Sequence, residues 1–296
     1  MRRPIIVAFF GLLLMACQAL AAERGALFTV TSKDQANTLY LYGTIHAGKA
    51  GYYPLEPRIG KAIAAAPTLA LEVDMTADPG AVQAAFSKYG LFAAGSAGYA
   101  GLPAERRRRL ETALKQQGVD PAAVAQLKPW LLTTMLAVRD VARLGYDPAL
   151  GVDAHLAGLA RGKARIAELE SAQYQAALLD RMPLEAQWSL LEETLEHMAS
   201  GRQLREAREL FDAYERADRK ALDEIARRID TDDSISGKFV REVVLDERNG
   251  PMADKLAALL AREQNAVAAI GLLHLLGKRG VPELLRARGL TVERVY

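Results

Sequence analysis

The sequence has little cysteine, few aromatic residues and almost no net charge. One cysteine among 296 residues excludes a disulfide scaffold, and aromatic residues at 6% argue against a surface that binds carbohydrate or stacks bases. Lys and Arg total 38 against 36 Asp and Glu, and two of these arginines, Arg2 and Arg3, lie in the first segment. The rest of the chain is therefore neutral, and no global charge favours a nucleic acid or a membrane surface as partner.

The N-terminal segment has the pattern of an export signal. Arg2 and Arg3 precede an apolar run over residues 5–16, which is too short to span a bilayer because that needs about 20 residues. The small residues Ala19-Leu20-Ala21 follow, and cleavage is expected after Ala21 or Ala22. We therefore expect residues 1–21 to be a signal peptide and residues 22–296 to be a single exported domain, periplasmic or secreted.

The only cysteine lies inside this segment. Leu14-Met15-Ala16-Cys17 resembles the site at which bacterial lipoproteins are lipidated, so a lipid anchor at Cys17 is the alternative to cleavage further on. No later apolar run reaches membrane-spanning length, so we expect no transmembrane segment in the mature chain.

Six short apolar runs, each bounded by Gly, Pro or polar residues, predict strands. They cover residues 27–31, 38–43, 68–73, 164–169, 266–270 and 291–295. Helical patterns over 103–117, 129–144 and 184–229 lie between them, and Gly201 is expected to break the last in two. This order predicts an α/β fold with a mixed or parallel central sheet flanked by helices. A large helical insertion separates the N-terminal and C-terminal sheet segments.

Two of the four histidines follow strand-like runs in the same local frame. Gly43-Thr44-Ile45-His46 ends one run, and Gly271-Leu272-Leu273-His274 ends another. Ligands of parallel sheets collect beyond the carboxyl ends of the strands. If the strands are parallel, both histidines lie at one edge, and we expect them within about 12 Å of each other, the reach of two side chains to one ion.

A carboxylate on a third run extends this pattern. Glu72 stands in Leu71-Glu72-Val73-Asp74, inside an apolar stretch where an unpartnered Glu is rare. Imidazole and carboxylate together suit Zn²⁺, Mn²⁺, Co²⁺ or Fe²⁺, any of which can turn a bound water into a nucleophile. Each G-x-x-H motif alone is equally typical of a buried histidine whose hydrogen bonds are satisfied, so that interpretation stays open.

The other candidates have simple structural interpretations beside the functional one. Asp153 in Gly151-Val152-Asp153 fits a helix N-cap, and His155 follows it into that helix. His197 lies among glutamates, which predicts a solvated helix face. Arg248-Asn249-Gly250-Pro251 predicts a turn before a helix over 252–263, from which a guanidinium could reach the site. The chain has no Gly-rich phosphate loop, no H-E-x-x-H and no G-x-S-x-G.

Taken together, these residues resemble the TraB/GumN family, which is related to the Tiki metalloproteases. The wider clan includes erythromycin-esterase-like proteins and haem-binding ChaN-like proteins. The matching segments run through nearly the whole mature chain. They are Tyr42–His46, Leu71–Asp74, Gly151–Asp153, Gly162-Lys163, Leu169-Glu170, Gln175, Arg248-Asn249, Gly271–Leu275 and Gly277.

The resemblance implies a metal-dependent hydrolase, and peptide-bond cleavage is described for the animal Tiki members. By this resemblance His46 and His274 hold a divalent ion, which we expect to be Mn²⁺, Co²⁺ or Zn²⁺. Glu72 is a further ligand or the general base. We expect Arg248 and Asn249 to stabilise the oxyanion, Asp153 to orient a ligand histidine, and the substrate to be a peptide or a small ester or amide.

Two other functions fit the same residues. One is a metal-free esterase in which His46 is the general base and Glu72 orients it. The other is a non-catalytic envelope protein that binds haem or another small molecule in the same cleft.

Overall fold

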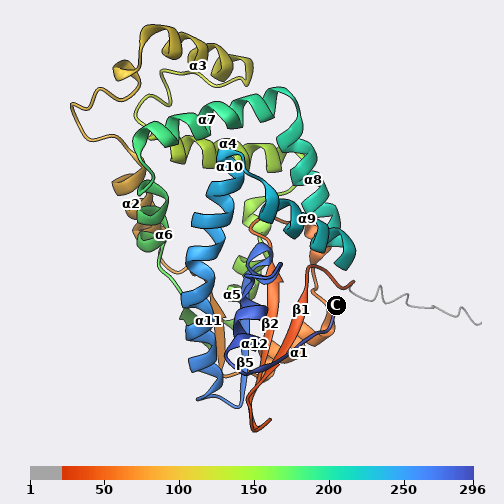
Figure 1. The fold of residues 1–296 in the computed structure, drawn as a ribbon. Coiled ribbons are helices and arrows are strands. Elements are labelled where there is room, and N and C mark those ends of the chain that lie inside the picture. Colours follow the sequence, from red (N-terminus) through yellow and green to blue (C-terminus); the bar gives the residue numbers. More distant parts are fainter. Residues whose placement is uncertain (1–21) are drawn as a thin grey trace, which may run out of the picture.

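A six-stranded mixed sheet forms the base of the molecule (Figure 1). The computed structural model describes residues 22–296, so the predicted signal peptide and Cys17 lie outside the described residues. Over that range the strand order is β4-β3-β5-β2-β1-β6. The strands are β1 Leu27–Thr31, β2 Thr38–Thr44, β3 Thr68–Leu71, β4 Arg165–Glu168, β5 Asn265–Gly271 and β6 Thr291–Arg294. Each lies on one of the six predicted runs, and the predicted α/β class is confirmed.

Four neighbouring strands of this sheet are parallel. These are β4, β3, β5 and β2, whereas β1 is antiparallel to both β2 and β6. Thr44 of β2 pairs with Gly271 of β5, and Leu71 of β3 pairs with Ala269 of β5. The carboxyl ends of these three strands therefore finish side by side at one edge of the sheet.

Helices cover the sheet and build the insertion above it (Figure 1). They are α1 Pro57–Ala65, α2 Pro79–Gly90, α3 Ala104–Gln116, α4 Pro129–Arg143, α5 Val152–Ala160, α6 Ala172–Asp180, α7 Leu184–Ala199, α8 Arg202–Glu215, α9 Arg219–Thr231, α10 Ile235–Lys238, α11 Glu247–Leu260 and α12 Val281–Ala287. Short 3₁₀ helices are η1 Ala50–Tyr52, η2 Gly98–Gly101, η3 Pro148–Leu150 and η5 Leu272–Leu275. The insertion comes in two parts, because β4 returns to the sheet between α5 and α6. None of the helices described is long and apolar enough to cross a membrane.

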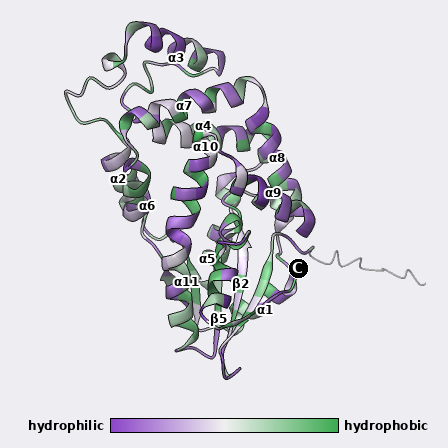
Figure 2. Ribbon diagram, in the orientation of Figure 1, coloured by the Kyte–Doolittle hydropathy of each residue, from purple (hydrophilic) through white to green (hydrophobic). Residues whose placement is uncertain are grey.

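Two hydrophobic clusters hold these layers together. The larger surrounds the sheet, and the smaller joins α3, α4 and α7 through residues such as Leu114, Leu132 and Leu191. Leu114 and Leu191 are fully buried, and burying one such side chain stabilises the fold by about 1.5–3 kcal/mol. Figure 2 shows hydrophobic residues along the strands and hydrophilic residues along α3 and α9.

The predicted helix over 184–229 is broken twice, not once. Gly201 has a positive φ of 70° and separates α7 from α8, as predicted. A second break follows at Ala217, also with positive φ, and Asp218 then caps α9 by accepting from the backbone N–H of Ala221. Composition predicts helix on both sides of this break, whereas Asp218 marks where the new helix begins.

The predicted turn at residues 248–251 is wrong. A π-helix, η4 Phe239–Asp246, joins α10 to α11, and the three form one continuous rod from the insertion to the sheet (Figure 1). Asn249, Gly250 and Pro251 all lie inside α11. Asn-Gly-Pro is a local turn signal, but Asn249 makes side-chain contacts with distant residues that favour the helix.

Candidate active site

Three side chains able to do chemistry follow adjacent parallel strands at the edge where these strands end. Glu72 comes directly after β3, His46 lies two residues after β2, and His274 belongs to η5, which follows β5. Because β2, β5 and β3 are parallel neighbours, the sheet brings together residues that are far apart in sequence. The structure thus places all three at one edge, as the topological argument predicts.

Gly271 is the point on which these side chains converge. A Cβ atom added there would lie 2.9 Å from Oε1 of Glu72, 3.5 Å from Nε2 of His46 and 3.5 Å from Cδ2 of His274. The two ring atoms are therefore at most about 7 Å apart, inside the predicted limit of about 12 Å. The absent side chain of Gly271 leaves a cradle lined by two imidazoles and one carboxylate.

His274 is buried and held in one tautomer. Its Nδ1 lies 2.6 Å from Oδ1 of Asn249, and the amide nitrogen of Asn249 donates to the carbonyl of Arg279 at 2.9 Å. Because the second bond fixes which end of the amide faces the ring, Nδ1–H donates and Nε2 keeps its lone pair. Burial lowers the pKa of His274 to about 4 despite the nearby Glu72, so the ring is neutral at pH 7.

His46 has the opposite electrostatic environment. Its Nδ1 lies 3.2 Å from Oδ1 of Asp153, the residue expected to orient a histidine, and its ring is 69% exposed. Desolvation by neighbouring groups lowers its pKa, but the hydrogen bond and charge of Asp153 outweigh this and raise the pKa to about 9. Solvent around the exposed ring screens the pair, so its contribution to stability is small.

Gly151 lets the Asp153 carboxylate reach His46. A Cβ at Gly151 would lie 2.8 Å from the carbonyl oxygen of His46, so only glycine permits this approach. The backbone N–H of Val152 donates to the carbonyl of Ile45 at 2.9 Å and fixes the start of α5 against the histidine. Gly151, not Asp153, is the N-cap of α5, which leaves the Asp153 side chain free for the ring.

Glu72 is a buried carboxylate with both oxygens hydrogen-bonded. Oε1 accepts from the backbone N–H of Gly271 at 2.5 Å and lies 3.9 Å from Nε2 of His274, whereas Oε2 accepts from Arg248 at 2.5 Å. Burial opposes ionisation. The two imidazoles, the guanidinium and the Gly271 N–H outweigh it and lower the pKa of Glu72 to about 2.

Glu170 is a member of the site that the motif argument did not assign. It is the second residue after β4, whereas Glu72 is the first after β3, and the backbone N–H of Glu170 donates to the carbonyl of Glu72 at 2.8 Å. Its carboxylate accepts from Nε of Arg248 at 3.0 and 3.1 Å and from Nη2 at 2.7 Å. The signal that could have found it is its place after a parallel strand next to β3.

The two residues expected to stabilise an oxyanion have other partners in this structure. Arg248 gives its hydrogen bonds to Glu72, to Glu170 and to the carbonyl of Val244. Asn249 contacts His274 and the carbonyl of Arg279. Asn249 is therefore placed to orient His274, and the oxyanion role of both residues stays a prediction.

The donor set around Gly271 fits a divalent ion in part. Nε2 of His46 faces the cradle, and Nε2 of His274 lies 3.9 Å from Oε1 of Glu72. Nδ1 of each ring is held by an oxygen, the arrangement typical of metal-binding histidines. Glu72 adds a carboxylate oxygen at the same point. Within residues 22–296, no group of three or more His, Cys, Asp or Glu side chains lies close enough to hold a metal ion.

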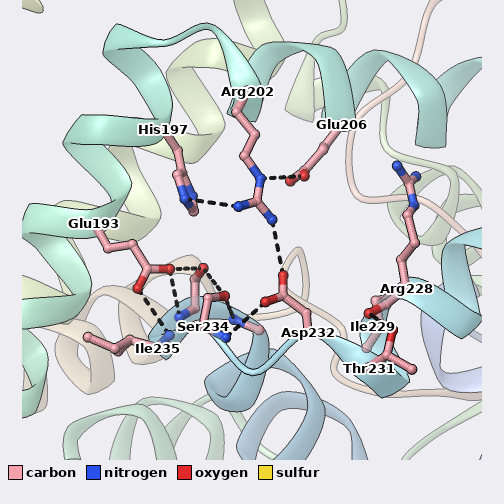
Figure 3. A network of polar contacts seen from close by, with 12 residues as sticks. Glu193, His197, Arg202, Glu206, Arg228, Ile229, Thr231, Asp232, Ser234 and Ile235 are labelled. Atoms are coloured by element: carbon pink, nitrogen blue, oxygen red, sulfur yellow. Dashed lines mark hydrogen bonds and ion pairs between the residues drawn. The ribbon is translucent and has the colours of Figure 1, made fainter.

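The remaining histidines lie apart from this constellation. His155 stacks on the ring of Tyr53 with centroids 3.8 Å apart. His197 is half-buried rather than fully solvated, and it lies 3.3 Å from Nη1 of Arg202 in a polar network where α7, α8, α9 and α10 meet (Figure 3). In that network Glu193 accepts from the first backbone N–H groups of α10. Tyr53 and Arg202 are therefore structural partners of His155 and His197.

Comparison with known proteins supports the family and gives no activity. The model of the TraB/PrgY/gumN family matches residues 26–294. The chain is 25% identical over 271 residues to the uncharacterized protein YbaP of Escherichia coli (strain K12), covering 90% of this chain and 96% of that protein. It is 25% identical over 248 residues to YbaP of Shigella flexneri, covering 83% and 87% respectively. No solved structure matches the chain.

Proposed function

The chain belongs to the TraB/PrgY/gumN family, and we propose that it is an exported metal-dependent hydrolase of the Tiki metallopeptidase type. The observation that carries the proposal is the convergence of His46, Glu72 and His274 on Gly271, a position that only a residue without a side chain leaves open. Two imidazoles and a carboxylate are donors that suit a divalent transition-metal ion, and they lie at the carboxyl edge of a parallel sheet, where ligands collect.

In this proposal Nε2 of His46 and Nε2 of His274 hold a divalent ion, Mn²⁺, Co²⁺ or Zn²⁺. When bound, the ion would lower the pKa of a water molecule so that hydroxide is available near neutral pH. Glu72 is either a third ligand or the base that takes the proton from that water. Its lowered pKa of about 2 keeps it ionised at pH 7, as a ligand must be, and makes it a weak base, so this pKa favours the ligand role.

The other residues orient these groups. Asp153 and Asn249 each accept from a histidine Nδ1 and so leave Nε2 of each ring as the nitrogen available to an ion. Arg248 supplies a fixed positive charge beside the carboxylate, where negative charge develops as water attacks an amide or ester carbonyl. The substrate class is a peptide or a small ester or amide.

A metal-free hydrolase is the second candidate, and one observation favours it. The pair formed by Asp153 and His46 orients an imidazole by a carboxylate at 3.2 Å, as in hydrolases whose histidine acts directly as general base. In that case Asp153, rather than Glu72 as first expected, orients the base. The pH dependence of hydrolysis would then follow His46 itself.

Hydrolysis by metal-stripped protein decides between the two. The purified protein is treated with chelator and assayed on a peptide library and on small esters, alone and with Mn²⁺, Co²⁺ or Zn²⁺ added back. The proposal expects activity only with an ion, and loss of both ion and activity in His46→Ala and His274→Ala. His155→Ala is the matched control, and full activity of stripped protein would move the metal-free hydrolase into first place.

Export is tested on the native N-terminus. The proposal places the start of the mature protein near Ala22 after removal of residues 1–21, with lipidation at Cys17 as the alternative. Mass spectrometry of protein from cell fractions reports either form. Recovery of the full-length chain from the cytoplasmic fraction would contradict export.

A further inference from the structure

Arg248 is shared unequally between two buried carboxylates. Its Nε and Nη2 edge faces Glu170, which accepts at 3.0, 3.1 and 2.7 Å, and only Nη2 also reaches Glu72, at 2.5 Å. All three side chains are at most 9% exposed. A guanidinium can grip one carboxylate with two parallel N–H groups, and here that grip goes to Glu170.

This division leaves one oxygen of Glu72 outside the reach of the guanidinium. Oε2 of Glu72 takes the single Arg248 contact, whereas Oε1 accepts from Gly271 and points to the cradle between the histidines. If Arg248 instead gripped Glu72 with both N–H groups, it would engage Oε1 as well, and that oxygen would turn away from the cradle.

Glu170 is itself held in place by two neighbours. Nε2 of Gln175, on the first turn of α6, donates to its Oε2 at 2.9 Å, and its backbone N–H donates to the carbonyl of Glu72 at 2.8 Å. The strand-to-helix corner between β4 and α6 therefore fixes the second carboxylate beside the first. The arrangement does more than neutralise a buried cation, which Glu72 alone could do.

We propose that Glu170 is a positioning residue: it takes the two-pronged grip of Arg248, so that Glu72 keeps Oε1 directed at His46 and His274. This inference rests on the proposed function for its consequence, because Oε1 is then the oxygen available to the ion or its water. Its geometry, however, is open to test without any ion.

The test is the substitution Glu170→Gln, which keeps the shape and removes the charge. We expect Arg248 to move its two-pronged grip to Glu72 and to break the contact of Oε1 with the Gly271 N–H, as seen in a crystal structure of the variant. Affinity for Mn²⁺, measured by calorimetry, is expected to fall about 10–100-fold, with kcat falling similarly and KM little changed.

Two further variants separate the orientation of Glu170 from a general loss of negative charge and from a failure to fold. Glu247→Gln removes a carboxylate one residue from Arg248 that pairs with Arg181 and is 36% exposed, and we expect no change in Mn²⁺ affinity or kcat. Because loss of a buried charge partner can prevent folding, Gln175→Leu is made in parallel. It removes only the hydrogen bond that orients Glu170, and we expect a smaller loss of Mn²⁺ affinity in the same direction.

The possible results separate the role of Glu170 from the proposed function. If Arg248 keeps its single contact to Oε2 of Glu72 in Glu170→Gln, the inference is overturned. The same holds if Glu170→Gln does not fold and Gln175→Leu binds Mn²⁺ like the wild type. If the wild-type protein binds no Mn²⁺, Co²⁺ or Zn²⁺ and hydrolyses nothing, the proposed function fails, while the position of Arg248 in the variant still decides the role of Glu170.

Discussion

The substitution Gly271→Ala tests the candidate site with a single added methyl group. The backbone of Gly271 has φ −52° and ψ 133°, which alanine adopts without strain, so any effect comes from the Cβ atom itself. That atom would lie 2.9 Å from Oε1 of Glu72, closer than non-bonded carbon and oxygen atoms approach. The Glu72 carboxylate or strand β5 must therefore move.

The expected magnitude follows from these contacts. Overpacking of this kind costs about 1–3 kcal/mol in the free energy of unfolding, so a domain of this size stays folded. A shift of a catalytic carboxylate by about 1 Å lowers activity about 10²-fold. We therefore expect a large loss of hydrolysis and ion binding with a modest loss of stability.

Gly250→Ala is the matched control. Apart from its chain neighbours and its own helix backbone, a Cβ at Gly250 meets no atom within 4 Å, and the residue lies inside α11, next to Asn249. Alanine is favoured over glycine in a helix by about 1 kcal/mol, but the ring of Pro251 disfavours a helical backbone at a preceding residue that has a Cβ. The two effects oppose each other, so this variant is expected to stay near wild type in stability and to keep activity. Urea unfolding followed by circular dichroism, calorimetry with Mn²⁺ and substrate kinetics measure the three quantities. Wild-type kinetics and ion affinity in Gly271→Ala would refute the convergence argument.

Three further predictions use the same protein. First, His46→Ala and His274→Ala are each expected to remove ion binding and activity, measured by calorimetry and kinetics. Because the groups act as a unit, the triple variant that also carries Glu72→Ala is expected to be scarcely less active than the worst single variant. His155→Ala is the control and is expected to stay near wild type. Second, His274 makes stability fall in acid. Its folded pKa of about 4 lies below the ordinary 6.5, so the unfolded chain binds more protons between these values. The contribution of His274, at most about 3 kcal/mol, is present above pH 6.5 and lost as the pH falls to 4. Urea unfolding of metal-free protein across this range checks it, and a curve for His274→Asn as steep as that of wild type would contradict it. Third, Asp153→Asn removes the charge that raises the pKa of His46, so that pKa falls from about 9 toward 6.5 in an NMR titration of metal-free protein.

The strands and the meeting of the histidines were predictable because their signals are local or topological. The runs 38–43 and 266–270 are apolar on successive residues, a pattern that strands buried on both faces require. Once two such strands are parallel, a residue just beyond the end of one must lie near a residue just beyond the end of the other. For His46 and His274 the one condition was that β2 and β5 be parallel, which the structure confirms.

The parts that sequence reasoning missed depend on contacts between distant segments. Residues 248–251 contain a turn signal, yet Asn249 bonds His274 and Arg279, and these tertiary bonds hold the segment in α11. Glu170 matters because β4 pairs with β3 and so sets this acid beside Glu72, a neighbour that no local pattern of residues 165–170 reveals. In both cases the deciding contacts are those of Arg248 and Asn249, whose partners lie on several different elements.

The two G-x-x-H motifs are alike in sequence but not in function within the site. A Cβ at Gly43 would meet Leu272 and Leu275, so this glycine serves the packing of η5 against β2, whereas Gly271 faces the polar cradle. The histidines differ as well. The pKa of His274 is lowered by burial and that of His46 is raised by Asp153, so at pH 7 the first is ready to be a ligand and the second carries a proton. Because a histidine must be neutral to bind a metal, the proposed site requires His46 to give up a proton when an ion enters. In the proposed metal site, one motif would therefore supply a preformed ligand, and the other a ligand whose proton competes with the ion. This asymmetry arises from the neighbours of each motif rather than from the motif itself.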